Sequence, residues 1–438
     1  MKIRGIVSAS AVLILIISAQ DQLYGWGNTW MGALIEQAVT QAWGMASPFR
    51  YNAALRIDSA SYDSDIYYGM LANSVPDFTI AAGPDLQVFL PIKQRVVFDI
   101  FESPRYVYYV KTSQERTLNN IFSADMHVIL DRLYFQAGGG LTDAKQRFSP
   151  ELNLNVRLKE DDLSGLALWQ ASGATSFALQ CQRSTYRYED LSGNFPSISQ
   201  SLDRTESFIN LFAYLQQHSR ARFYLEGQYG SYVFTEEVSS FKNSRSYAAY
   251  VGVEFVPPAG GFEDQTSGMR GNFGLGYKYL NILNPDYKGY SGLAGNIDIS
   301  LGILKLTALR LYFSRNPQFS VYPGLTYYLQ TSYGAGLSRA LARHVLFMYD
   351  FSYSRDDYPA AEATGGSPLG GSAFRYITHA FRLSYQMRKD FEIGLLADIG
   401  RRNSPFAPRP VSNRAFIGIN LTWGYSAGRL SLPTGPFF

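Results

Sequence analysis

Apolar and polar residues alternate with a period of two in one run after another along most of the chain. In residues 222–229, for example, Arg222 and Glu226 alternate with Phe223 and Leu225. Successive side chains of a β-strand point to opposite faces, so each run predicts a strand with one apolar and one polar face. The clearest runs are 209–215, 222–229, 293–303, 327–337, 391–399 and 417–423.

The length of these runs indicates which kind of β-protein the chain forms. Segments of about ten residues with alternating hydropathy, each ending in a turn, are typical of outer-membrane barrels. A soluble sandwich uses shorter strands and buries its apolar face against a second sheet. We therefore expect a transmembrane antiparallel β-barrel, an all-β fold, over residues 49–425.

Turn lengths predict the orientation and the number of strands. Long polar connections at 58–76, 188–206, 359–374 and 401–413 are expected outside, and short turns on the periplasmic side, with 257–268 as the exception. A first count gives about nineteen strands, whereas two periplasmic termini require an even number. Treating Glu151–Ala171 as one strand keeps Val156, Leu158 and Leu166 in one register. This predicts about eighteen strands, with sixteen to twenty as the range.

Composition agrees with a barrel and excludes other classes. Charged residues make up 17% and aromatic residues 15%, and no internal stretch approaches 18 consecutive apolar residues. A net charge of +3 argues against a nucleic-acid surface. Tyrosines and tryptophans near predicted strand ends, such as Tyr106, Tyr186, Tyr188 and Trp423, suit aromatic girdles at the membrane boundary.

The first 48 residues differ from the rest of the chain. Lys2 and Arg4 precede an apolar run and a small-residue exit, so residues 1–19 are expected to be a cleaved signal peptide. Residues 20–48 are expected to be a periplasmic segment with an amphipathic helix over 29–43. This helix covers a barrel rim, docks a partner or lies inside the pore; we expect it outside the wall. Residues 426–438 form a C-terminal tail.

The alternation also sorts residues between membrane and lumen. The apolar phase, represented by Ile209, Leu225, Ile299, Leu329, Leu395 and Ile419, is expected to face lipid. The polar phase supplies the candidate lumen-lining residues Asp99, Asp125, His127, Tyr214, Arg222, Tyr224, Glu226, Lys278, Asp298, Arg310, Tyr312, Tyr328, Arg382, Glu392 and Asp398.

Charges of both signs are mixed among these candidates, so strong ion selectivity is not expected. Inward tyrosines such as Tyr214 and Tyr328 have two interpretations: sliding contacts for sugar chains, or rings that stiffen the wall. The single cysteine, Cys181, shares the face of Phe177 and Leu179 and is expected to face lipid.

Catalytic motifs are not found. The sequence has no Gly-x-Ser-x-Gly elbow, P-loop, His-Glu-x-x-His or dinucleotide fingerprint. His379 falls among lipid-facing residues, yet no serine partner is evident in the sequence. We expect no enzyme, no catalytic residues, no metal and no cofactor.

Three short motifs resemble a known family. They are Tyr62-Asp63-Ser64-Asp65-Ile66-Tyr67, Pro76-Asp77-Phe78-Thr79 and Ser184-Thr185-Tyr186-Arg187-Tyr188-Glu189. Residues 51–188 thereby resemble the outer-membrane β-barrel porin family associated with bacterial exopolysaccharide export. The resemblance implies a porin-like conduit for an exported polysaccharide, with outer-membrane lipid, the polysaccharide and periplasmic export components as partners. The alternatives are a structural or adhesive barrel with a closed lumen and, less favoured, an outer-membrane enzyme.

Overall fold

The computed structural model describes residues 51–424 except 69, 72, 93–94, 148–150, 152–153, 191–196, 219–220, 256–268, 305, 323, 360–372, 389 and 405–409. The expected signal peptide, the helix over 29–43 and the tail 426–438 lie outside the described residues. Among the described residues, no helix is long and apolar enough to cross a membrane.

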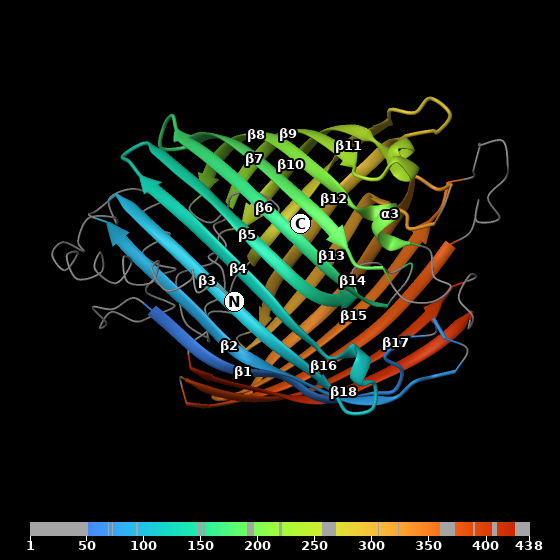
Figure 1. Ribbon diagram of the computed structural model, residues 1–438. Coiled ribbons are helices and arrows are strands. Elements are labelled where there is room, and N and C mark those ends of the chain that lie inside the picture. Colours follow the sequence, from blue (N-terminus) through green and yellow to red (C-terminus); the bar gives the residue numbers. More distant parts are fainter. Residues whose placement is uncertain are drawn as a thin grey trace, which may run out of the picture.

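Eighteen strands form one closed ring (Figure 1). The strands are β1 Tyr51–Asp63, β2 Asp77–Ile92, β3 Val96–Tyr109, β4 Thr117–Ile129, β5 Leu133–Arg147, β6 Asn155–Gln170, β7 Thr175–Tyr188, β8 Arg204–His218, β9 Ala221–Phe234, β10 Ser244–Phe255, β11 Met269–Ile282, β12 Tyr290–Leu304, β13 Thr307–Phe319, β14 Tyr327–Ala342, β15 Val345–Asp357, β16 Ala373–Arg388, β17 Phe391–Asn403 and β18 Val411–Gly424. Within the described ranges, three short helices lie in connections: η2 Ser113–Glu115, α3 Ile198–Leu202 and η3 Glu237–Lys242.

Each strand is antiparallel to the strands before and after it, and β1 also pairs with β18. This last pairing, with Leu55 opposite Trp423, closes the ring and removes both sheet edges. The predicted antiparallel barrel of eighteen strands is confirmed. The disputed segment 151–171 contains one strand, β6, as the parity argument required.

Connection lengths separate the two ends of the barrel. The connections 93–95, 130–132, 171–174, 219–220, 305–306, 343–344 and 389–390 share one end with the longer 256–268. The connections 64–76, 110–116, 148–154, 189–203, 235–243, 283–289, 320–326, 358–372 and 404–410 share the other. Long connections mark the external end of such barrels. We call the two ends the short-turn end and the long-loop end.

Burial follows the predicted alternation. On β9, Leu225 is 60% exposed, whereas Arg222 is only 1% exposed. A closed wall has only an outside and an inside, so the exposed apolar phase faces lipid and the buried polar phase faces inward. Ile209, Leu395 and Ile419 are exposed like Leu225, and Cys181 is exposed as well.

Two sequence expectations about individual side chains were wrong. Leu329 packs against the buried cluster that contains Tyr232 and Leu280, because the long-loop end of the β13–β14 hairpin is covered on both faces. Tyr186 and Tyr188 face inward and do not form a girdle, since they share a phase with the inward-facing Ser184. Trp423 and Tyr106, by contrast, are exposed on the outer face.

Candidate functional site

The inner face of the wall carries the side chains that the sequence assigned to the lumen. Strand registers and alternating burial place on this face Asp99, Asp125, His127, Tyr214, Arg222, Tyr224, Glu226, Lys278, Asp298, Arg310, Tyr312, Tyr328, Arg382, Glu392 and Asp398. That they line the path of a solute stays a prediction.

Part of the inner face along β12–β17 is open to water. Arg310 binds Asp298 across β12 and β13 through two hydrogen bonds, Nε to Oδ1 at 2.7 Å and Nη2 to Oδ2 at 2.6 Å. Their side chains are 48% and 40% exposed, and Arg382 on β16 is exposed too. A side chain on the inner face of a closed wall can reach solvent only inside the barrel. The lumen is therefore an aqueous space along these strands.

The inner face along β2–β11 is more deeply buried, and several of its charged groups are paired or hydrogen-bonded. Arg222 Nε donates to Glu254 Oε2 at 2.9 Å, and the Arg222 guanidinium lies 4.0 Å from the centroid of the Tyr214 ring. The Tyr224 ring lies 6.2 Å from that of Tyr214. His127 Nδ1 is 2.8 Å from Tyr134 Oη.

Carboxylates on neighbouring strands of this region are also bound by amides. Gln87 Nε2 donates to Asp99 Oδ1 at 3.1 Å, and Gln136 Nε2 donates to Asp125 Oδ1 at the same distance. These groups therefore contribute to the structure of the wall, and the mixed signs give it no strong single-sign field.

At the long-loop end, loops from distant parts of the ring meet on one buried carboxylate. Glu151 Oε1 accepts hydrogen bonds from Ser320 Oγ and Tyr358 Oη, both at 2.6 Å, and Glu151 Oε2 accepts from the Val321 amide at 2.7 Å. Glu151 follows β5, whereas Ser320 follows β13, almost half-way around the ring. The bonds therefore tie loops together across the mouth. We call Glu151, Ser320, Val321, Tyr358 and Arg402 the outer hub.

Two buried cations extend the outer hub to further loops. Arg402 on β17 donates from Nη2 to the Glu151 carbonyl at 2.8 Å and from Nη1 to the Met70 sulfur at 3.1 Å. Lys242 donates from Nζ to the carbonyls of Ser320 at 2.7 Å and Ser201 at 3.0 Å. Contacts from seven different segments thus meet at the outer mouth.

Burial shapes the acid–base properties of these loop groups. It raises the pKa of the Glu151 carboxyl, although the bonds from Ser320, Tyr358 and Val321 and the charge of Lys242 favour the ionised form. Burial also lowers the pKa of Lys242 to about 8. Burial therefore disfavours the charged forms of Glu151 and Lys242 while the loops are held together.

The end of the β13–β14 hairpin forms part of an internal cavity. The Phe319 ring lies 5.0 Å from both the Tyr232 and the Phe234 ring of β9, four strands away around the wall. A cavity of about 510 Å³ lies between this hairpin and the inner wall. Its lining is Arg147, Leu158, Gln182, Tyr186, Tyr188, Arg204, Glu206, Phe208, Gln228, Tyr232, Lys278, Leu280, Asn316, Pro317, Gln318 and Phe319.

Aromatic rings and hydrogen-bonding groups mix in this cavity. Arg204 Nε donates to Glu206 Oε1 at 2.6 Å, and its guanidinium lies 4.5 Å from the Tyr186 ring centroid. Gln228 is only 5% exposed, yet neither amide atom has a hydrogen-bond partner among the described residues. The cavity therefore offers an amide for a polar guest.

The described histidines do not form a catalytic arrangement. His379 Nδ1 lies 2.9 Å from Tyr349 Oη, and both residues belong to the outward phase of β15 and β16. Within the described part of the chain, no group of three or more His, Cys, Asp or Glu residues could hold a metal ion.

Sequence reasoning identified Lys278 of the cavity and missed the outer hub. Glu151 is an isolated acid in a loop, and no local pattern distinguishes it from a solvated surface residue. Tyr186 and Tyr188 could have been found, because their phase on β7 matches the inward Ser184. Gln228 likewise follows the inward phase of Arg222 and Glu226.

Comparisons with solved structures give distant likenesses. OccK1 (OpdK) of Pseudomonas aeruginosa has 10% identity, with 86% of this chain and 98% of that chain covered and a TM-score of 0.47. The siderophore receptor PirA of the same organism has 10% identity, 86% and 80% coverage, and a TM-score of 0.44. A bacterial polysaccharide outer membrane secretin has 11% identity, 86% and 99% coverage, and a TM-score of 0.35. These likenesses say nothing about the solute. No curated protein matches the chain.

A family of sequences matches more than half of the chain. The match covers residues 151–405, so it overlaps the stretch that carried the sequence resemblance only from 151 to 188. The closed barrel and this family place the protein in the outer membrane as a porin-like channel, rather than among enzymes. The chain belongs to the family described as "Putative beta-barrel porin 2".

Proposed function

We propose that this barrel conducts carbohydrate across the outer membrane, with an exported polysaccharide as its solute. The single observation that supports this solute class best is the internal cavity beside the β13–β14 hairpin. It combines tyrosine rings, primary amides and an arginine–glutamate pair at one level of the lumen. Rings can pack against the apolar faces of sugars, while amides and carboxylates bond hydroxyl groups.

The size and polarity of the cavity fit a short stretch of a sugar chain. Its volume of about 510 Å³ lies in the range of roughly 300–1,000 Å³ that is typical of small-molecule pockets. Gln182, Gln228 and Gln318 offer both donors and acceptors, as a hydroxyl-rich guest requires. The mixed charges, by contrast, do not select strongly for an ion of one sign.

The water-exposed inner face along β12–β17 supplies a route past the cavity. Asp298, Arg310 and Arg382 border this route. The outer hub narrows its external end, so conduction of a polymer requires that the long loops separate. The proposal is therefore a gated conduit.

Current recordings with oligosaccharides test the proposal. Short neutral oligosaccharides added to the purified barrel in a planar bilayer should block the ionic current in a concentration-dependent way. Gln228→Leu and Tyr232→Leu should weaken this block several-fold, because they remove an amide and a ring from the cavity. Tyr229→Leu is the matched control, since Tyr229 lies on the outer face of the same strand.

The current recordings also define the opposing outcome. If sugars block the wild type and Tyr232→Leu equally, the cavity is not the sugar site. If sugars block neither protein although both conduct, the solute is not carbohydrate.

A structural barrel with a closed lumen is the second candidate. The outer hub favours it, because buried hydrogen bonds hold loops together across the mouth. A wild-type barrel that inserts and folds but carries no current, while a hub variant does conduct, would support this alternative. Measurable wild-type conductance would exclude it.

A further inference from the structure

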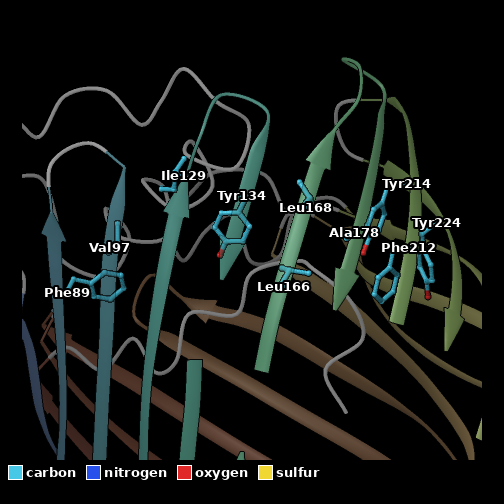
Figure 2. Packing of buried hydrophobic residues seen from close by; sticks show 10 residues of the cluster. All are labelled: Phe89, Val97, Ile129, Tyr134, Leu166, Leu168, Ala178, Phe212, Tyr214 and Tyr224. Atoms are coloured by element: carbon cyan, nitrogen blue, oxygen red, sulfur yellow. The ribbon is translucent and has the colours of Figure 1, made fainter. Parts of the chain in front are cut away.

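Ten inward side chains form an apolar area at the short-turn end of β2–β9 (Figure 2). We call it the inner apolar patch: Phe89, Val97, Ile129, Tyr134, Leu166, Leu168, Ala178, Phe212, Tyr214 and Tyr224. Nine of them lie within five residues of a short turn, and Phe212 lies seven residues before one. The patch therefore forms a band around one half of the periplasmic end of the lumen.

This band is buried more deeply than a barrel wall alone can explain. The wall is one strand layer thick, so its inward side chains have neighbours beside them but none above. Val97 is nevertheless 0% exposed. On the opposite side the long side chains of Arg310 and Arg382 remain exposed at a comparable level, and the buried inward residues there, such as Ala308 and Ser384, are small. An apolar partner on one side of the lumen accounts for this asymmetry.

The N-terminal segment of the same chain has the composition that such a partner needs. Met31, Leu34, Ile35, Ala38, Val39, Ala42 and Trp43 recur at helical spacing. Glu36, Gln37, Thr40 and Gln41 occupy the other face. An amphipathic helix covers an apolar surface with one face and leaves the other to water. Two other segments start at this end. The connection 256–268 is poorer in apolar residues and contains Pro257 and Pro258, and the chain after Gly424 is interrupted by Pro433 and Pro436.

The distances along the chain allow this helix to reach the patch. Strand β1 begins at Tyr51 at the short-turn end and pairs with β2, the first strand of the patch. Residues 44–50 can extend over about 24 Å, and a helix over 29–43 is about 22 Å long. Together they span several strands of the wall, which lie about 4.8 Å apart.

We propose that residues 29–43 lie inside the barrel as an amphipathic helix, with their apolar stripe on the inner apolar patch. The helix then fills the β2–β9 half of the periplasmic end and leaves the β12–β17 half as the aqueous route. This replaces the expectation of a helix outside the wall. The proposal rests on the patch and not on the nature of the solute.

Thiol labelling at Val97 tests the contact directly. In a Cys181→Ala chain, a Val97→Cys thiol should react several-fold more slowly with a water-soluble maleimide than the same thiol in a chain lacking 29–43. An Arg382→Cys thiol, on the exposed inner half, should react at the same rate in both chains. Heat-modifiable migration on a gel verifies that each variant is a folded barrel.

Equal labelling of Val97→Cys with and without 29–43 would overturn the proposal. If the thiol stays protected in both chains but becomes reactive when 256–268 is shortened, that connection is the partner instead. If it reacts rapidly in both, the patch has no partner in the chain.

A pair of charge variants supplies an independent readout. Leu34→Asp with Ala38→Asp puts two charges on the apolar stripe and should release the helix, raising single-channel conductance. Gln37→Asp with Gln41→Asp adds the same charge to the polar face and should leave conductance unchanged. Identical conductance in both double variants and the wild type contradicts a helix inside the lumen.

Discussion

Replacing Glu151 with leucine tests whether the outer hub holds the long loops across the mouth of the barrel. Leucine fills a similar space but accepts no hydrogen bond. The Ser320 hydroxyl, the Tyr358 hydroxyl and the Val321 amide then lose their acceptor while the loops stay closed. All three donors belong to loops at the long-loop end, so the strand registers are not disturbed.

The size of the effect follows from the cost of buried, unsatisfied donors. Each costs about 1–3 kcal/mol, so three destabilise the closed arrangement by roughly 3–9 kcal/mol. Since about 1.4 kcal/mol is tenfold in an equilibrium constant, even the lower bound shifts the loops toward opening by about a hundredfold. The barrel itself should remain folded, because its pairing runs through all eighteen strands.

Two assays follow the opening. Glu151→Leu should show longer and larger open-channel currents than the wild type, and an added protease should cut loops 148–154 and 320–326 faster. Glu151→Gln is the control, because its amide oxygen still accepts a hydrogen bond and only part of the hub is lost. If Glu151→Leu has wild-type currents and wild-type protease resistance, the hub does not close the mouth.

Three further predictions concern pH, selectivity and stability. Burial raises the pKa of Glu151 above its ordinary 4.5. The neutral carboxyl therefore contributes fully to the stability of the closed loops below about pH 4.5. This contribution is lost as the pH rises through the raised pKa. The open probability of the wild-type channel should accordingly rise with pH. The recordings stay below pH 8, because Lys242 titrates at about that pH. In Glu151→Gln the open probability should vary much less with pH. Arg382→Glu should shift the reversal potential in a salt gradient toward cation selectivity, whereas Arg375→Glu, on the outer face of the same strand, should not. Leu225→Arg should reduce folding stability by about 2–4 kcal/mol if it lies near the bilayer midplane; a urea titration matching that of Leu225→Phe would refute the lipid-facing assignment.

Much of the barrel could be predicted from local sequence patterns. The faces of β9 follow from the alternation of Arg222 and Glu226 with Phe223 and Leu225, because side-chain direction in a strand depends only on parity. The orientation and the even strand count follow from turn lengths and from treating 151–171 as one strand. Turn length and strand phase are local properties of the chain, so they do not depend on contacts between distant residues.

The outer hub could not be predicted in this way, because it depends on which distant residues meet. Glu151 and Tyr358 are 207 positions apart, and Arg402 reaches Glu151 across 251 positions. Leu329 keeps the apolar phase of a lipid-facing residue, yet it is partly buried and packs against the cluster of Tyr232 and its neighbours. Alternation determines the two faces of each strand by itself. Only the closed ring decides which loops converge, because closure brings residues from almost opposite strands across one narrow mouth.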